Sequence, residues 1–239
     1  MGSRPTARVL AIGHSAYVTG LKEVLAIKAL TKYERIYAIH FGGFNDQTAA
    51  MGARLLPLGL TNPTQESDLH VVYGDSSILP HAYKSTPRPS RPMDLTRIYS
   101  NFTVSTSKKS RKSLFNSLPD IPHILHGIID RTLAGRARYL SEIRESGLVL
   151  CPGGKGPDSH RLYETLYKGA LPVVLKNSYQ FQLCRHFGFP AVGLDKWRQV
   201  ADIGLIRELA SEERFSDAGL TALMMSSWVG QEGLLLRRD

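Results

Sequence analysis

The chain has 239 residues, of which 42% are hydrophobic and 21% charged, an ordinary composition for a globular protein with its own core. Its two cysteines, Cys151 and Cys184, exclude a disulfide framework and a cysteine-based zinc site, and no apolar run approaches the ~18 residues of a membrane span. The formal net charge of +9 favours an anionic partner: nucleic acid, an anionic membrane surface or a phosphorylated small molecule.

The first part of the chain combines short apolar runs with one amphipathic run. Residues 20–33 have apolar side chains near helical spacing and predict a helix. Four other runs have the length and the turn boundaries of strands: 7–13, 34–41, 54–60 and 68–74. The first of these is typical of a buried strand rather than of a signal peptide, so we expect a cytoplasmic protein with no integral membrane segment.

Residues 84–94 are rich in proline and serine and predict an exposed linker, after which the same alternation resumes. Three runs predict strands: 97–106, 147–151 and 170–175. Five stretches predict helices: 107–118, 136–146, 160–169, 177–188 and much of 195–228. Strands that alternate with helices form parallel sheets with crossover helices. The fold class is therefore α/β, with two Rossmann-like halves that we place at residues 1–90 and 91–239.

Residues 151–175, CPGGKGPDSHRLYETLYKGALPVVL, place a Gly-rich turn between a strand and a helix. Lys155 stands between Gly154 and Gly156 instead of following the second glycine of a P-loop, and the third glycine of a dinucleotide fingerprint is missing. Cys151 ends a buried strand and is expected to be a core residue rather than a nucleophile. What the glycines predict is a turn that allows the backbone to approach a ligand closely.

The helix that follows this turn begins with charged residues. Asp158 or Ser159 is the expected N-cap, and the free N–H groups of a helix N-terminus favour an anion. His160 and Arg161 lie in the first turn, where cations oppose the helix dipole unless an anion offsets them. Glu164 falls on the same face. Two interpretations stay open: a surface cluster of salt bridges, or a nucleotide site with basic side chains on the diphosphate and Glu164 on the ribose hydroxyls.

The segment LVLCPGGKGPDSHRLYETLYKGALPVVL resembles a characteristic segment of exostosin-like glycosyltransferases and their bacterial and viral relatives. The positions that match its pattern are Cys151, Pro152, Gly154, Gly156, Asp158, His160, Arg161, Glu164, Leu166, Tyr167, Gly169 and Pro172. Three further segments are similar to the same family in the right order: 54–62, 98–115 (at Asn101, Phe102, Thr106 and Arg111) and 192–200 (at Trp197).

The resemblance implies a GT-B-like fold, in which two Rossmann-like domains face each other across a cleft. Residues 1–90 would form the acceptor-side domain and residues 91–239 the nucleotide-sugar-binding domain. The implied activity is that of a hexosyl- or pentosyltransferase, which moves a sugar from an NDP-sugar, UDP-linked as the first expectation, to a glycan or other hydroxyl acceptor with inversion. No metal is implied, and the NDP-sugar is a substrate, so no cofactor is expected.

Without a metal, the helix dipole and basic side chains must neutralise the leaving diphosphate. The residues that the resemblance assigns to the donor are Arg111, Gly154, Gly156, Asp158, His160, Arg161 and Glu164. An inverting transferase also needs a base for the acceptor hydroxyl. His14, after the first predicted strand, is the first choice for this base, with Asp46 and then His40 as rivals.

Two alternatives belong to other classes. A basic module that binds nucleic acid or another polyanion would use the +9 charge, but lysines and arginines are scattered rather than clustered with aromatic residues, so we expect no nucleic-acid partner. The second alternative is an inactive GT-B-type protein that binds a nucleotide or glycan and lacks the base.

Overall fold

The computed structural model describes residues 9–12, 35–39, 50, 53–57, 94–118, 120–130, 132–154 and 156–213. The predicted helix at 20–33, the predicted strand at 68–74 and the linker up to residue 93 lie outside the described residues.

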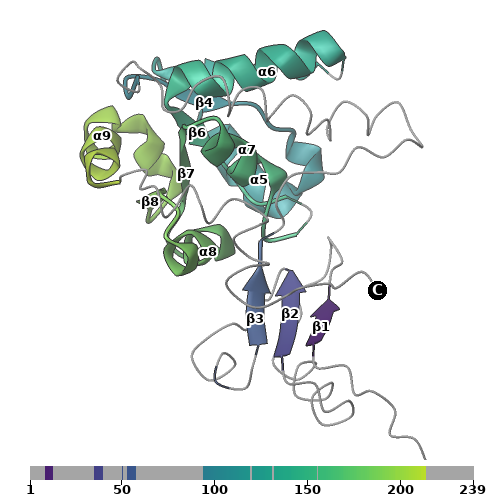
Figure 1. Cartoon of the computed structure of the whole chain (residues 1–239). Coiled ribbons are helices and arrows are strands. Elements are labelled where there is room, and N and C mark those ends of the chain that lie inside the picture. The colour runs from purple at the N-terminus through teal and green to yellow at the C-terminus, as the bar shows by residue number, and fades with distance from the viewer. Residues whose placement is uncertain are drawn as a thin grey trace, which may run out of the picture.

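The N-terminal part contributes a three-stranded parallel sheet (Figure 1). Its strands are β1 (Val9–Ile12), β2 (Arg35–Ile39) and β3 (Ala53–Leu56), which pair in the order β1-β2-β3. The predictions of strands at 7–13, 34–41 and 54–60 are confirmed at these places, although β3 starts one residue earlier and ends four residues sooner. Tyr37, Ala53 and Leu55 are buried, as expected for a sheet with covered faces.

The C-terminal part is built around a five-stranded parallel sheet in the order β5-β4-β6-β7-β8. Its strands are β4 (Ile98–Ser100), β5 (Ile124–His126), β6 (Leu148–Leu150), β7 (Leu171–Leu175) and β8 (Val192–Leu194). Between them lie the helical elements η1 (Val104–Thr106), α5 (Lys108–Asn116), α6 (Leu133–Ser146), α7 (His160–Tyr167), α8 (Tyr179–Phe187), η2 (Trp197–Ala201) and α9 (Ile203–Glu212). The α/β class is therefore confirmed.

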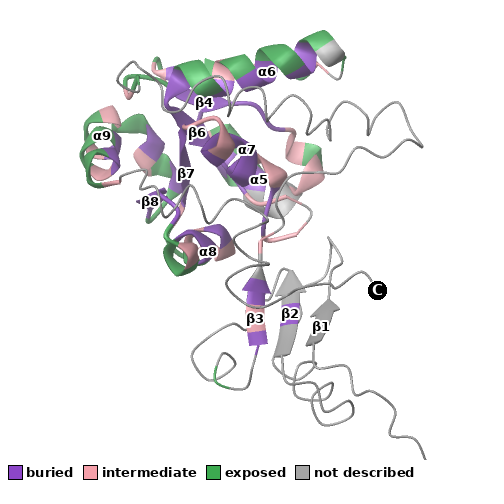
Figure 2. Cartoon of the chain, viewed as in Figure 1, coloured by how far each residue is buried: buried purple, intermediate pink, exposed green. Residues whose placement is uncertain are grey.

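Strands β4, β6, β7 and β8 are buried almost throughout (purple in Figure 2), whereas the edge strand β5 is exposed at Leu125 and His126. Successive side chains of a strand point to opposite faces, so the central strands β4, β6 and β7 contribute to two core clusters. One cluster contains Ile98, Leu148 and Val173 and is covered by residues of α5, η2 and α9. The other contains Tyr99 and Val149 and is covered by residues of α6, α7 and α8. None of the helices in the described ranges combines the length and the apolar character that a membrane crossing requires.

Local signals set the ends of the helices. The side chain of Thr132 caps α6 by accepting a hydrogen bond from the Gly135 N–H at 3.0 Å. Gly169, predicted to close the helix before β7, has a φ of 76°, the left-handed conformation that glycine adopts without steric cost.

The sequence-based expectations fail at the shortest strands. The predicted strand at 97–106 ends at Ser100, and the 3-10 helix η1 follows. The edge strands β5 and β8 have three residues each and were not predicted. The sequence of β5 ends in His126 and that of β8 contains Gly193, so neither forms a clear apolar run, and the pairing with β4 and β7 decides their conformation.

Candidate functional site

The candidate site lies where the order of strands reverses. β4 is followed in the chain by β5 on one side, and the chain then crosses to β6 on the other side of β4. In open parallel α/β sheets, ligands bind outside the carboxyl ends of the strands at such a switch point. Asn101 directly follows β4, and the turn that contains Gly153 and Gly154 follows β6. The resemblance and the topology therefore indicate the same edge of the sheet.

Arg161 extends from the first turn of α7 towards β4. Its guanidinium donates to the backbone carbonyl of Asn101, and its Cζ lies 5.9 Å from the ring centroid of Tyr139. Its Nε is buried and has no hydrogen-bond partner within the described part of the chain. Burial opposes the charged form, but neighbouring groups, Tyr139 and Cys151 first among them, outweigh it and raise the pKa of Arg161. The Arg161 side chain is therefore a cation whose Nε–H group makes no hydrogen bond within the described residues.

Arg111 reaches the same place from α5 and is 5% exposed. Its Nε donates to the Gly153 carbonyl at 2.8 Å and its terminal nitrogen to the Thr103 carbonyl at 3.0 Å, with the Phe102 ring centroid 5.6 Å from Cζ. Burial, and then the charge of Arg161, lower the pKa of Arg111 to about 10. The two guanidiniums are thus close enough to repel each other.

The Glu164 carboxylate attracts Arg161 through its charge, but its salt bridge is with Arg136. Arg111 and Arg161 bond to backbone carbonyls and rings, and neither forms a salt bridge with a carboxylate in the described ranges. Two like charges held together in a partly buried place are unfavourable unless something compensates them. An anion with oxygens for both guanidiniums would do so.

Glu164, one turn further along α7, belongs to a second, balanced cluster. Its Oε1 accepts from Arg136 at 2.6 Å and its Oε2 from the Tyr139 hydroxyl at 2.7 Å. The Glu164 side chain is 6% exposed, so it is not part of a surface cluster of salt bridges. Burial raises its pKa, but Arg136, Tyr139 and Arg161 outweigh burial, and the pKa of Glu164 lies below the ordinary value.

The Gly-rich turn is folded against itself. A Cβ on Gly153 would lie 3.4 Å from the Pro157 carbonyl oxygen, and one on Gly154 would lie 3.3 Å from that of Asp158. On the side where a Cβ would stand, these two glycines face the turn's own backbone. Gly156 is partly exposed.

The residues around the start of α7 divide into buried and accessible ones. Asp158 is 2% exposed and accepts from the Ser159 N–H at 2.7 Å and from the Tyr163 hydroxyl at 2.6 Å. Ser159 is the N-cap residue, but its side chain makes no capping bond and accepts from Gln180 instead. Asp158 therefore supports the turn from inside, while His160, the first residue of α7, is partly exposed.

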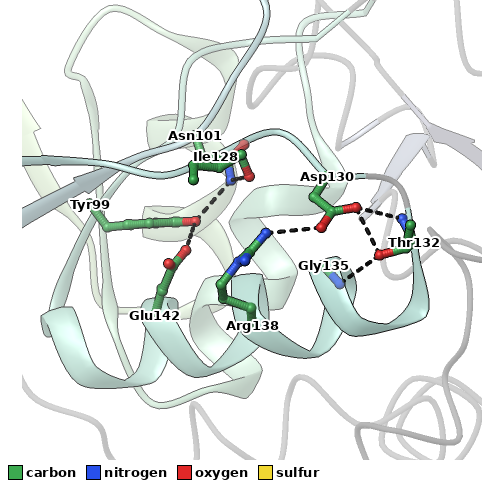
Figure 3. A network of polar contacts seen from close by, with 8 residues as sticks. All are labelled: Tyr99, Asn101, Ile128, Asp130, Thr132, Gly135, Arg138 and Glu142. Carbon is green, nitrogen blue, oxygen red and sulfur yellow. Dashed lines mark hydrogen bonds and ion pairs between the residues drawn. The ribbon is translucent and has the colours of Figure 1, made fainter.

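Asn101 is held in place by a polar network, which Figure 3 shows. Its Nδ2 donates to the Tyr99 hydroxyl at 2.8 Å and to the Ile128 carbonyl at 3.2 Å. The Tyr99 hydroxyl in turn donates to Glu142 of α6 at 2.5 Å. Because the Asn101 carbonyl receives Arg161, this network fixes one end of the arginine pair.

Sequence reasoning missed Arg136 and Tyr139. A usable signal exists, because residues 136, 139, 140 and 143 follow the i, i+3, i+4, i+7 spacing of one helix face. An arginine on an otherwise apolar stripe indicates a buried cation, and a buried cation requires a partner.

The three candidates for the base, His14, Asp46 and His40, lie outside the described residues, as does Lys155. Cys151 is fully buried, its Sγ is 3.5 Å from the Thr165 hydroxyl, and burial raises its pKa to about 12. This confirms the prediction of a core cysteine. Within the described ranges, no three His, Cys, Asp or Glu residues gather into a group that could hold a metal ion.

Comparison with known proteins identifies the C-terminal part of the chain. The model of the RXYLT1 C-terminal domain matches residues 88–218, more than half of the chain, and RXYLT1 is a xylosyltransferase and hence a glycosyltransferase. A search of curated protein sequences finds no significant match. The matched residues include both clusters described above.

Proposed function

Because the chain belongs to the RXYLT1 C-terminal domain family, we propose that it transfers a sugar from a nucleoside diphosphate sugar to a hydroxyl group of a glycan or other acceptor. The family supports glycosyltransferase activity in general. The donor, the acceptor and the mechanism given below are our proposal.

One observation carries the choice of donor. Arg111 and Arg161 come together at the switch point of the sheet, and within the described residues no carboxylate pairs with either. A diphosphate has the charge and the oxygens that this pair lacks, and planar guanidiniums bind such oxygens in a bidentate manner. The pair supplies the positive charge that a departing diphosphate needs, so we propose a metal-independent reaction.

The other donor-side residues have supporting roles in the proposal. Backbone N–H groups at Gly154 and Gly156, together with His160, would bind diphosphate oxygens beside the start of α7. Glu164 would accept the ribose hydroxyls with the lone pairs that Arg136 and Tyr139 leave available, since an ionised carboxylate has about four acceptor sites. Asp158 would keep the turn in shape through Tyr163.

The chemical step that we propose is a single displacement with inversion. The acceptor oxygen forms a bond to the anomeric carbon while the bond from that carbon to the diphosphate oxygen breaks, and the nucleoside diphosphate leaves with the electron pair. A general base takes the proton of the acceptor hydroxyl. His14 is the proposed base, with Asp46 as its rival.

The proposed architecture is GT-B-like. The three-stranded parallel sheet would belong to the acceptor-side domain at residues 1–90, and the five-stranded sheet to the donor domain at residues 91–239. A UDP-linked pentose is the first donor to test, because RXYLT1 is a xylosyltransferase.

A thermal-shift screen of the full chain tests the proposal. Nucleoside diphosphates and UDP-sugars, UDP-xylose among them, are each added at increasing concentration, with EDTA present throughout. A true ligand at about 100 times its Kd adds roughly 2.7 kcal/mol to the free energy of unfolding, which raises Tm visibly. Stabilisation by single-stranded RNA alone, with a steep salt dependence, would instead favour the polyanion-binding alternative. Binding of a UDP-sugar that is neither hydrolysed nor transferred would favour the inactive one.

A further inference from the structure

Two arginines are placed to pair with Glu164, and the salt bridge forms with the one that is more distant in the sequence. Arg161 lies three residues before Glu164 on α7, a spacing at which helical side chains commonly pair. The salt bridge instead joins Glu164 to Arg136 of α6, with Nη2 and Oε1 2.6 Å apart and both side chains 6% exposed. Arg161 turns to the Asn101 carbonyl.

Tyr139 lies next to both arginines. Its hydroxyl occupies the second carboxylate oxygen of Glu164 at 2.7 Å. Its ring centroid lies 4.9 Å from the Arg136 guanidinium carbon and 5.9 Å from that of Arg161. Both oxygens of Glu164 therefore have a donor from α6, and the carboxylate has little reason to move towards Arg161.

We propose that Arg136 is a positioning residue of the diphosphate site. It retains Glu164 as its own counter-ion and so leaves the Arg161 guanidinium to the ligand. This inference rests on the proposed function, because it takes Arg111 and Arg161 as the residues that bind diphosphate.

The proposal follows from the cost of an unpaired charge in the core. If Arg136 lost its charge, the buried Glu164 carboxylate would have to find another cation or take up a proton. Arg161 is the nearest candidate among the described residues, and its charge already favours the ionised form of Glu164. A ligand would then have to break a salt bridge before it could bind Arg161, which weakens binding although Arg136 never touches it.

Calorimetric titration of the full chain with inorganic diphosphate tests this. The probe lacks a ribose, so a role of Glu164 in ribose binding does not enter. The chains to compare are the wild type, Arg136→Met, Arg136→Lys, Glu164→Gln and the double variant Arg136→Met with Glu164→Gln. We expect Arg136→Met to weaken binding by about tenfold, a usual size for coupling between two groups. The double variant should return to within about twofold of the wild type, Arg136→Lys should stay close to it, and Glu164→Gln should bind at least as tightly.

A merely structural role predicts a different pattern, because the double variant would then bind no better than Arg136→Met. That result, or wild-type affinity in Arg136→Met, overturns the inference while leaving the proposed function intact. If Arg136→Met does not fold, the diphosphate affinity of Glu164→Gln tests the inference instead. Weaker binding by Glu164→Gln than by the wild type contradicts it. Failure of the wild-type chain to bind diphosphate overturns the proposed anion site and the inference with it.

Discussion

Two charge clusters meet at α7, and they are built in opposite ways. In the first, Glu164 has a counter-ion in Arg136 and a hydrogen bond from Tyr139, so every charge is compensated. In the second, Arg111 and Arg161 are held by backbone carbonyls, and neither forms a salt bridge with a carboxylate of the described residues. Breaking a balanced buried cluster is costly, whereas an unbalanced one is unfavourable in isolation and is relieved by a ligand. Changes in the first cluster should therefore be largest in stability, and changes in the second should be largest in diphosphate binding.

The largest expected effect concerns the balanced cluster. Glu164→Ala leaves the Arg136 guanidinium buried without its carboxylate, so the free energy of unfolding should fall by about 3–5 kcal/mol. Urea denaturation followed by circular dichroism measures the loss. Glu208→Ala, at an exposed position on α9, is the matched control and should be nearly neutral. A loss below about 1 kcal/mol in Glu164→Ala would mean that this cluster is not balanced by the pair we describe.

Arg161→Ala should produce the next largest effect, this time on binding. Removal of a charged donor to the diphosphate is expected to weaken UDP affinity by about 10- to 100-fold, with only a modest change in stability. Isothermal titration calorimetry gives the affinity. Arg207→Ala removes an equal charge from an exposed position on α9 and serves as the control. Equal loss in both variants would indicate general electrostatic attraction rather than a site.

The two clusters also show what the sequence could predict. The regular alternation of strands and helices identified the α/β class, and α7 with Arg161 in its first turn was placed correctly. The spacing of Arg161 and Glu164 left open a surface cluster of salt bridges, and the burial of Glu164 against α6 excludes that alternative. The local i, i+3 preference is only a few tenths of a kcal/mol, so tertiary packing overrides it. Tertiary packing, rather than any local signal, brings Arg136 to Glu164.

Arg111 illustrates the opposite case. It lies 50 residues before Arg161, and no periodicity connects the two positions. Only the family resemblance predicted that both serve one site, and the crossover from β4 to β6 explains how they meet. The edge strands β5 and β8 were not predicted for a different reason, since a histidine ends the first and a glycine interrupts the second, so neither forms a clear apolar run.

A smaller effect is expected from acid. The pKa of Glu164 is lowered in the folded chain, so its contribution to stability is present above its ordinary pKa of 4.5 and is lost as the pH falls through the lower folded value. Asp94 and Asp130 also have lowered pKa values, so the wild-type slope contains their contributions. Glu164→Gln removes only the Glu164 contribution. As the pH is lowered from about 7 to about 3, the urea midpoint of Glu164→Gln should therefore fall less steeply than that of the wild type. Identical slopes in the two chains would contradict the assignment.

The smallest effect should come from the network that anchors Asn101. Tyr99→Phe removes the hydrogen bonds to Glu142 and Asn101 and is expected to cost about 1–2 kcal/mol of unfolding free energy. UDP affinity should change less than about threefold. The Asn101 side chain still donates to the Ile128 carbonyl in this variant, so the Asn101 carbonyl that accepts from Arg161 stays in place. A loss of affinity as large as in Arg161→Ala would place Tyr99 within the binding cluster itself.

The most direct test of the arginine pair is the structure of the full chain with UDP bound. The account predicts that diphosphate oxygens lie within hydrogen-bonding distance of both Arg111 and Arg161, at the carboxyl ends of β4 and β6, while Glu164 keeps its salt bridge to Arg136. A diphosphate bound elsewhere, with both guanidiniums still on the carbonyls of Asn101 and Gly153, would contradict it.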